Sequence, residues 1–268
     1  MSVWLPSAPC TPGACIEPTG SATAVPRAVL RMAAVVVLVL AGIVLSPLGG
    51  RIPAELVRRW SRWVVRAAGA QILITGAAAP TGGLLLVANH ISWLDIPLLA
   101  AVRPARMLAK AEIRHWPVAG PVAARASLFI DRDRLRALPD TVARIADELR
   151  DGGAVAVFPE GSTWCGRAQG DFRRAVFQSA LDAGVPVQPV RLQYRIAGGT
   201  PSTAPAFIGN DSLLASVWRV VTARGLVAEV DVQQPIAPGS HHDRRSLARA
   251  AQPAATAQPG WIHTALVA

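Results

Sequence analysis

The fold of this chain is constrained most by an alternation of short apolar runs with helical stretches, which begins after Gln71. The apolar runs occupy 84–88, 105–109, 127–130, 154–158 and 187–194, and a later one lies near 226–232. Helical spacing of apolar residues is found at 142–149, at 172–183 and near 211–223. Strands that alternate with helices predict an α/β fold with a mostly parallel sheet flanked by helices, which we place at 71–236.

Polar residues of the types that act in catalysis or ligand binding follow three of these runs directly. They are His90, Arg132 and Glu160. Pro159 ends the strand before Glu160, and Gly161 allows a tight turn after it. Because ligands of open α/β sheets gather at the carboxyl ends of the strands, a base, a cation and a carboxylate are expected at one crevice.

The stretch "NHISWLD" places Asp95 five residues after His90. A carboxylate within reach of the imidazole fixes its tautomer and stabilises the imidazolium that forms on proton uptake. A helix that begins nearby disfavours a protonated ring, so His90 is predicted to act as a general base. The alternative is structural: Ser92 and Asp95 also match a helix-capping pattern.

Two other interpretations of the polar residues remain open. Arg132 stands among Asp131, Asp133 and Arg134, which is also typical of a solvated charge cluster. A serine hydrolase would need an elbow such as GxSxG, which the sequence lacks, and Ser92 beside His90 is a poor substitute.

The N-terminal part of the chain predicts attachment to a membrane. Residues 1–27 show no periodicity and predict a disordered leader. The segment 28–48 carries Arg31 as its only charge and is long enough to enter a bilayer; the arginines after it favour a retained anchor over a signal peptide. In 51–66, arginines alternate with Trp and aliphatic residues at helical spacing, which indicates an interfacial amphipathic helix or, alternatively, a helix packed on the domain. We therefore predict an anchor region over 28–70, with the catalytic domain on the cytoplasmic face.

The net charge of +10 and the mean hydropathy of +0.34 suit a protein at an anionic membrane surface. A nucleic-acid partner is not expected, because the arginines do not form one stripe and aromatic surface for base stacking is scarce. Cys10, Cys15 and Cys165 show no metal-ligand spacing, so we expect a reduced domain without disulfides.

These residues carry a resemblance to a known family. "NHISWLD" resembles the NHxxxxD block of the glycerolipid acyltransferases, which include 1-acylglycerol-3-phosphate acyltransferases, and "FPEGST" at 158–163 is similar to their second diagnostic block. "KAEIRHWPVAGP" from Lys110, with "FIDR" at 129–132, is similar to the block between them, and "VPVQPV" at 185–190 to the last one. Only Gln188 and Ser162 depart from the pattern, and neither touches the expected chemistry.

The resemblance implies a glycerol-3-phosphate acyltransferase-like fold and a membrane-associated O-acyltransferase. It implies transfer of a fatty acyl group from acyl-CoA or acyl-ACP to a lysophospholipid hydroxyl, with no metal and no further cofactor. His90 would take the hydroxyl proton while Asp95 orients the ring.

The resemblance also assigns the acceptor site. Arg132 would bind the acceptor phosphate, assisted by Lys110, and Glu160 with Gly161 would form the acceptor-binding pair. The expected acceptor is 1-acylglycerol-3-phosphate, which gives phosphatidic acid; the alternative is another lyso-lipid, such as a lyso-aminolipid. A non-catalytic membrane scaffold is the alternative of another class, and 237–268 is expected to be a C-terminal tail.

Overall fold

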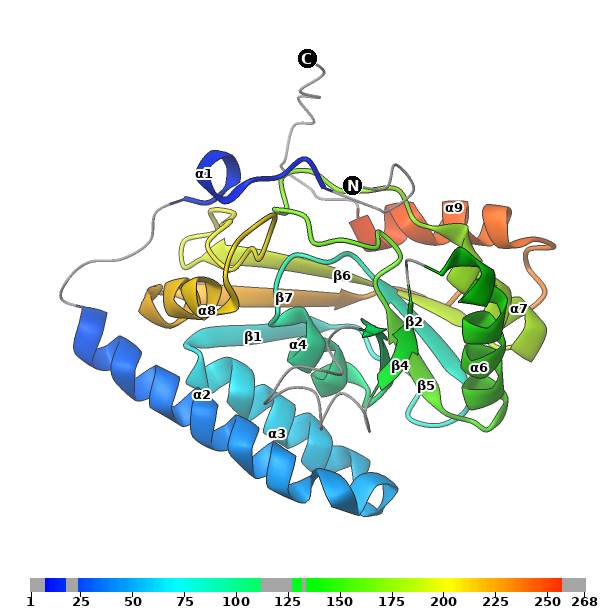
Figure 1. Ribbon diagram of the computed structural model, residues 1–268, viewed down its shortest axis with the longest axis horizontal. Coiled ribbons are helices and arrows are strands. Elements are labelled where there is room, and N and C mark those ends of the chain that lie inside the picture. Colours follow the sequence, from blue (N-terminus) through cyan, green and yellow to red (C-terminus); the bar gives the residue numbers. More distant parts are fainter. Residues whose placement is uncertain (1–7, 18–23, 112–126, 132–133, 257–268) are drawn as a thin grey trace.

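The computed structural model describes residues 8–17, 24–111, 127–131 and 134–256. Its centre is a seven-stranded sheet in the order β1-β7-β6-β2-β5-β3-β4 (Figure 1). The strands are β1 (Ala70–Thr75), β2 (Leu84–Ala88), β3 (Arg106–Lys110), β4 (Ser127–Ile130), β5 (Ala154–Val157), β6 (Val187–Ile196) and β7 (Leu226–Val232). All pairs are parallel except β6 with β7, which confirms the predicted mostly parallel α/β fold.

Both faces of the sheet are buried, and β2 shows how. Its five residues are all buried, and their side chains alternate between the two faces. Leu84 and Leu86 join the core cluster that also contains residues of α4 (Asp95–Val102) and α8 (Leu213–Thr222). Leu85 and Val87 join the cluster formed with α6 (Leu138–Arg150), α7 (Phe177–Ala183) and α9 (Arg244–Thr256). A continuous apolar run is therefore required here, as in other strands covered on both sides.

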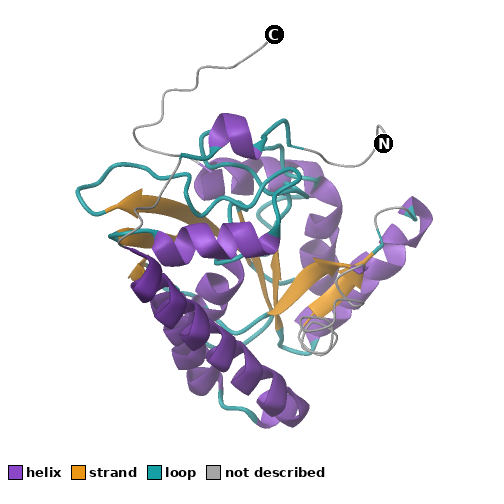
Figure 2. Ribbon diagram, turned by 60° about the vertical axis from the view of Figure 1, so that its left-hand side comes forward, coloured by secondary structure: helices purple, strands orange, loops and turns teal. Residues whose placement is uncertain are grey.

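Two N-terminal helices form a neighbouring pair along one side of the molecule (Figures 1 and 2). They are α2 (Val25–Leu45) and α3 (Ala54–Ala67), which are joined by the 3-10 helix η2 (Ser46–Arg51). Within the described residues, α2 is the one helix long and apolar enough to cross a membrane. Its 21 residues span about 31 Å, close to the thickness of a bilayer core.

The helix pair is fastened to the domain by individual polar contacts. Arg31 Nη1 donates hydrogen bonds to the carbonyl oxygens of Val221 and Ala223, each at 2.9 Å, at the end of α8. Within the pair, Trp60 Nε1 of α3 donates to the Leu38 carbonyl oxygen of α2 at 3.1 Å. The buried residues of α3, which include Val64 and Val65, show that this helix packs on the domain.

The sheet domain extends beyond the predicted boundaries at both ends. Residues 8–17, predicted as part of a disordered leader, have a defined placement that includes the short helix α1 (Pro12–Cys15), and Cys10 is buried. The segment docks through single side chains, which leaves no periodic pattern to detect. In the predicted tail, α9 buries Leu247, Ala251 and Ala255 against the sheet. Alanines give a weak hydrophobic signal, which is why this helix was missed.

Candidate active site

The imidazole of His90 lies at the carboxyl end of β2 and is held by the carboxylate of Asp95. The distance from His90 Nδ1 to Asp95 Oδ2 is 2.8 Å. Because an ionised carboxylate only accepts hydrogen bonds, the ring proton resides on Nδ1 and the lone pair of Nε2 is available. The Asp95 side chain is fully buried, whereas 21% of the His90 side chain is exposed. The structure thus brings together the pair that the sequence predicted.

Asp95 is fixed by further donors on both of its oxygens. Oδ2 also accepts the backbone N–H groups of Ile91 at 2.6 Å and Ser92 at 2.8 Å. The bond from the Ser92 N–H to Asp95, together with the bond from the Leu94 N–H to the Ser92 hydroxyl, is the reciprocal pattern of a capping box, so the capping alternative is also confirmed. The carboxylate of Asp95 therefore both caps the start of this helical turn and holds His90.

Tyr194 supplies the donor to the other oxygen, and the sequence analysis missed it. Its hydroxyl donates to Asp95 Oδ1 at 2.6 Å from β6. Burial and the nearby Asp95 charge raise the pKa of Tyr194 well above 10, so the phenol stays protonated and remains a donor. The available signal was that the only tyrosine of the chain lies in a largely buried strand, where its hydroxyl needs a partner.

The ring and backbone of His90 have partners on neighbouring strands as well. Phe158 stacks on the imidazole with ring centres 3.9 Å apart and an angle of 9° between the planes. Asn89 is clamped to β6 through both ends of its amide: Nδ2 donates to the Leu192 carbonyl at 2.9 Å, and Oδ1 accepts the Leu192 N–H at 2.8 Å. The backbone N–H of Trp164 donates to the His90 carbonyl at 2.8 Å. Phe158, β6 and Trp164 therefore all contact the residues at the carboxyl end of β2.

Glu160 lies in the same region but is engaged by the backbone. Its Oε2 accepts the His90 N–H at 2.8 Å, and its Oε1 accepts the Gly170 N–H at 3.0 Å. Burial raises the pKa of Glu160 to about 8, although these two N–H groups act in the opposite direction. Gly161 has φ of 77°, and its N–H donates to the Phe158 carbonyl, so it makes the predicted tight turn. In this geometry Glu160 positions the loop after β5 against His90.

The remaining sequence-predicted site residues are placed less closely or not at all. Lys110 is exposed at the carboxyl end of β3, two strands from β2 in the sheet. Arg132 and most of the motif block that begins at Lys110 lie outside the described residues. Ser92 is fully buried, and its hydroxyl accepts the N–H of Leu94 at 3.3 Å, which argues against a nucleophilic serine.

Known proteins that are similar to this chain are acyltransferases. The family model described as Acyltransferase matches residues 71–193. The lyso-ornithine lipid O-acyltransferase of Pseudomonas aeruginosa is 40% identical over 202 residues, which cover 73% of this chain and 75% of that protein. The 1-acyl-sn-glycerol-3-phosphate acyltransferase of Neisseria gonorrhoeae is 35% identical over 178 residues, which cover 65% and 69%.

A solved structure shares the fold. It is the 1-acyl-sn-glycerophosphate acyltransferase PlsC of Thermotoga maritima, with a TM-score of 0.59, 20% identity, and coverage of 76% of this chain and 77% of that one. The two relatives described above show the family as well as the fold, because both exceed 30% identity over most of their length. From the motif blocks, the family model and these relatives, the chain belongs to the acyltransferase family that includes the 1-acyl-sn-glycerol-3-phosphate and lyso-ornithine lipid O-acyltransferases.

Proposed function

We propose that this enzyme transfers a fatty acyl group from a thioester, acyl-CoA or acyl-ACP, to the free hydroxyl of a lyso-lipid. The observation that carries the proposal is the exposed side of His90, whose Nδ1 is bound to buried Asp95 at 2.8 Å. Nε2 takes the proton of the acceptor hydroxyl while its oxygen attacks the thioester carbonyl. The carbon–sulfur bond then breaks, and the proton passes to the leaving thiolate, so the products are an ester and a thiol.

The acceptor we expect is 1-acylglycerol-3-phosphate, which gives phosphatidic acid. The name of the Neisseria gonorrhoeae relative supports this acceptor. A lyso-ornithine lipid is the second candidate, supported by the Pseudomonas aeruginosa relative at 40% identity over three quarters of its length. Both reactions acylate a hydroxyl and place the same demand on His90, so the catalytic pair does not distinguish them.

The roles of Arg132 and Lys110 in binding an acceptor phosphate remain predictions. A guanidinium presents a planar set of donors that matches phosphate oxygens. Lys110 stands at the same edge of the sheet as His90, because β2 and β3 both run parallel to β5. An acceptor with a phosphate would use these cations.

We propose that the protein attaches to the membrane through exposed apolar residues of α2, α3 and α8. These residues are Val29, Leu30, Val36, Val37, Leu40, Val44, Leu56, Trp63, Leu213, Leu214 and Trp218. α2 is bound to the domain through Arg31 and packs on α3, where the ring of Trp60 lies against Gly42. A helix held against the domain in this way supports insertion into one leaflet, with the domain on the cytoplasmic face where acyl thioesters are made.

The test is an acyl-transfer assay with the purified full-length enzyme, a labelled acyl thioester and a panel of lyso-lipids. The panel contains 1-acylglycerol-3-phosphate, a lyso-ornithine lipid and a lysophosphatidylcholine. Formation of phosphatidic acid supports the main proposal, and acylation of the ornithine lipid alone supports the second candidate. Lipid binding without turnover for every acceptor and both donors would contradict acyl transfer and favour a scaffold.

A further inference from the structure

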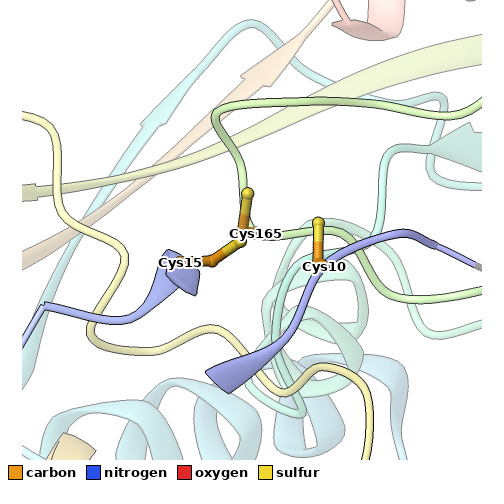
Figure 3. Close-up of side chains that lie close together, drawn as sticks. All are labelled: Cys10, Cys15 and Cys165. Carbon is orange, nitrogen blue, oxygen red and sulfur yellow. The ribbon is translucent and has the colours of Figure 1, made fainter. Parts of the chain in front are cut away.

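Three cysteines that are far apart in the sequence meet at one point beside the active-site loop. Cys10 and Cys15 belong to the N-terminal segment 8–17, and Cys165 belongs to the loop that follows β5. Their sulfur atoms all lie within 4.8 Å of one another (Figure 3). Cys10 and Cys165 are buried, and Cys15 is partly buried. The sequence spacing alone gave no indication of this cluster.

Other contacts hold the N-terminal segment in this position. Glu17 forms an ion pair with Arg167, two residues after Cys165, and the Glu17 N–H donates to Thr203 Oγ1 at 3.1 Å. The carbonyl oxygen of Cys10 lies against Gly209, where a Cβ would approach it to 3.0 Å. The three thiols are therefore brought together by a docked segment.

The three sulfur atoms form one group, in which Cys10 and Cys165 are buried and Cys15 is partly buried. Cysteine sulfur is the ligand type that soft cations prefer. Three sulfurs this close together therefore match the donor set of such a cation.

We propose that Cys10, Cys15 and Cys165 form a binding site for one thiophilic cation of the Zn²⁺ class. Zinc–sulfur bonds of about 2.3 Å in tetrahedral geometry place sulfur atoms about 3.8 Å apart, so small side-chain movements within the observed 4.8 Å are sufficient. Each thiol gives up its proton to solvent on binding. Three protein ligands leave the fourth position for water or another small donor.

The bound ion would join the N-terminal segment to the loop that supports His90. Trp164, the residue before Cys165, donates its N–H to the His90 carbonyl at 2.8 Å. The same loop carries Phe158 and Glu160, which contact the ring and the backbone of His90. The site thus lies outside the proposed acyl-transfer chemistry but is connected to it through one loop.

The experiment uses the full-length enzyme, purified in detergent under reducing conditions, and Co²⁺ as a spectroscopic probe. About one Co²⁺ per chain should bind with the intense near-ultraviolet absorption of cobalt–thiolate bonds, and Zn²⁺ should displace it. Cys15→Ser and Cys165→Ser should lose this absorption and at least about tenfold in cobalt affinity. Glu55→Gln, at an exposed position on α3, is the control: it keeps all three sulfurs and the contacts that hold the N-terminal segment, and it should retain the absorption.

Three results would overturn the site. One is wild-type enzyme that binds no Co²⁺ or Zn²⁺ although alkylation and mass analysis find three free thiols. Another is a disulfide between two of the cysteines under the reducing conditions used. The third is equal cobalt absorption in the serine variants. Circular dichroism of each variant verifies folding, and Cys15→Ser, at the partly exposed position, is the variant least expected to disturb it.

Discussion

At the scale of single residues, the reactivity of His90 depends on how firmly Asp95 is held. One buried carboxylate accepts hydrogen bonds from the imidazole, two backbone N–H groups and the Tyr194 hydroxyl. Since buried acceptors without donors are costly, each of these bonds also contributes to the stability of the turn. Substitutions around Asp95 should therefore affect catalysis and folding together.

Asp95→Asn is expected to lower kcat by about 10²- to 10⁴-fold while KM changes little. The amide nitrogen cannot accept the hydrogen bonds that Oδ2 now receives, so the ring loses its fixed tautomer. Steady-state kinetics of the purified variant measure the effect, and the loss should be smaller than that of His90→Ala. Wild-type kcat in Asp95→Asn would show that the carboxylate does not orient the base.

Tyr194→Phe should lower the free energy of unfolding by about 1–3 kcal/mol, because Asp95 Oδ1 loses its donor in a fully buried site. A smaller decrease in kcat, without a change in KM, should accompany it. Thermal unfolding in detergent and steady-state kinetics test both parts. A variant as stable and as active as the wild type would remove Tyr194 from the supporting network.

Glu160 predicts a pH dependence of stability. Its folded-state pKa of about 8 lies above the ordinary value of 4.5, so the unfolded chain releases this proton first as the pH rises. The stability contribution of the neutral carboxyl is present below pH 4.5 and is lost as the pH rises through 8, on the order of 5 kcal/mol in total.

Melting temperatures measured from about pH 5 to about pH 9 test this dependence, because this range includes the folded-state pKa of about 8. In Glu160→Gln the decline of stability with rising pH should be smaller than in the wild type. Glu55→Gln, an exposed position on α3, is the matched control and should keep the wild-type profile. Parallel profiles for wild type and Glu160→Gln would show that Glu160 does not titrate in this range.

Much of the site could be predicted from local sequence, and the rest could not for a physical reason. His90 and Asp95 are joined by one turn, so their spacing was enough to predict contact. Tyr194 and Phe158 reach the pair from other strands, and only the three-dimensional fold determines that approach. Glu160 was expected to bind the acceptor; its hydrogen bonds to two N–H groups indicate a positioning role that no motif encodes.

At the scale of elements, the hydropathy of the sequence predicted the apolar helix α2, but it did not predict that α2 binds to the end of α8. The apolar segment 28–48 lies largely in α2, which begins at Val25 and ends at Leu45. Its attachment depends on hydrogen bonds from Arg31 to carbonyl groups at the end of α8. The sequence separations of these two contacts are 190 and 192 residues. Such a contact leaves no trace in a local pattern.

Exposed apolar residues of α2 yield a prediction about membrane binding. The Leu30 side chain is 72% exposed, so Leu30→Glu should leave folding intact but weaken flotation with anionic liposomes. Leu73→Glu is the matched control: Leu73 is exposed on β1 between the exposed polar residues Gln71 and Thr75. Equal flotation of both variants and the wild type would contradict insertion of this face of α2.

At the scale of the whole molecule, a sheet covered on both sides supports a base, its carboxylate and a loop at one end of its parallel strands. The helix pair lies along one side of this sheet, and the three cysteines lie where the N-terminal segment meets the active-site loop. Alternating apolar runs were enough to predict the sheet. The docked ends of the chain, 8–17 and α9, escaped prediction because they pack through single or small side chains.

The role of His90 as the base for acyl transfer is tested by comparing two histidine variants with the wild type. Acyl transfer from a labelled thioester to the best acceptor is measured for the wild type, His90→Ala and His242→Ala, where His242 is an exposed histidine far from β2 in sequence. We expect a loss of at least about 10²-fold for His90→Ala in a variant that still folds by circular dichroism, and full activity for His242→Ala. Turnover by His90→Ala close to that of the wild type would contradict the mechanism.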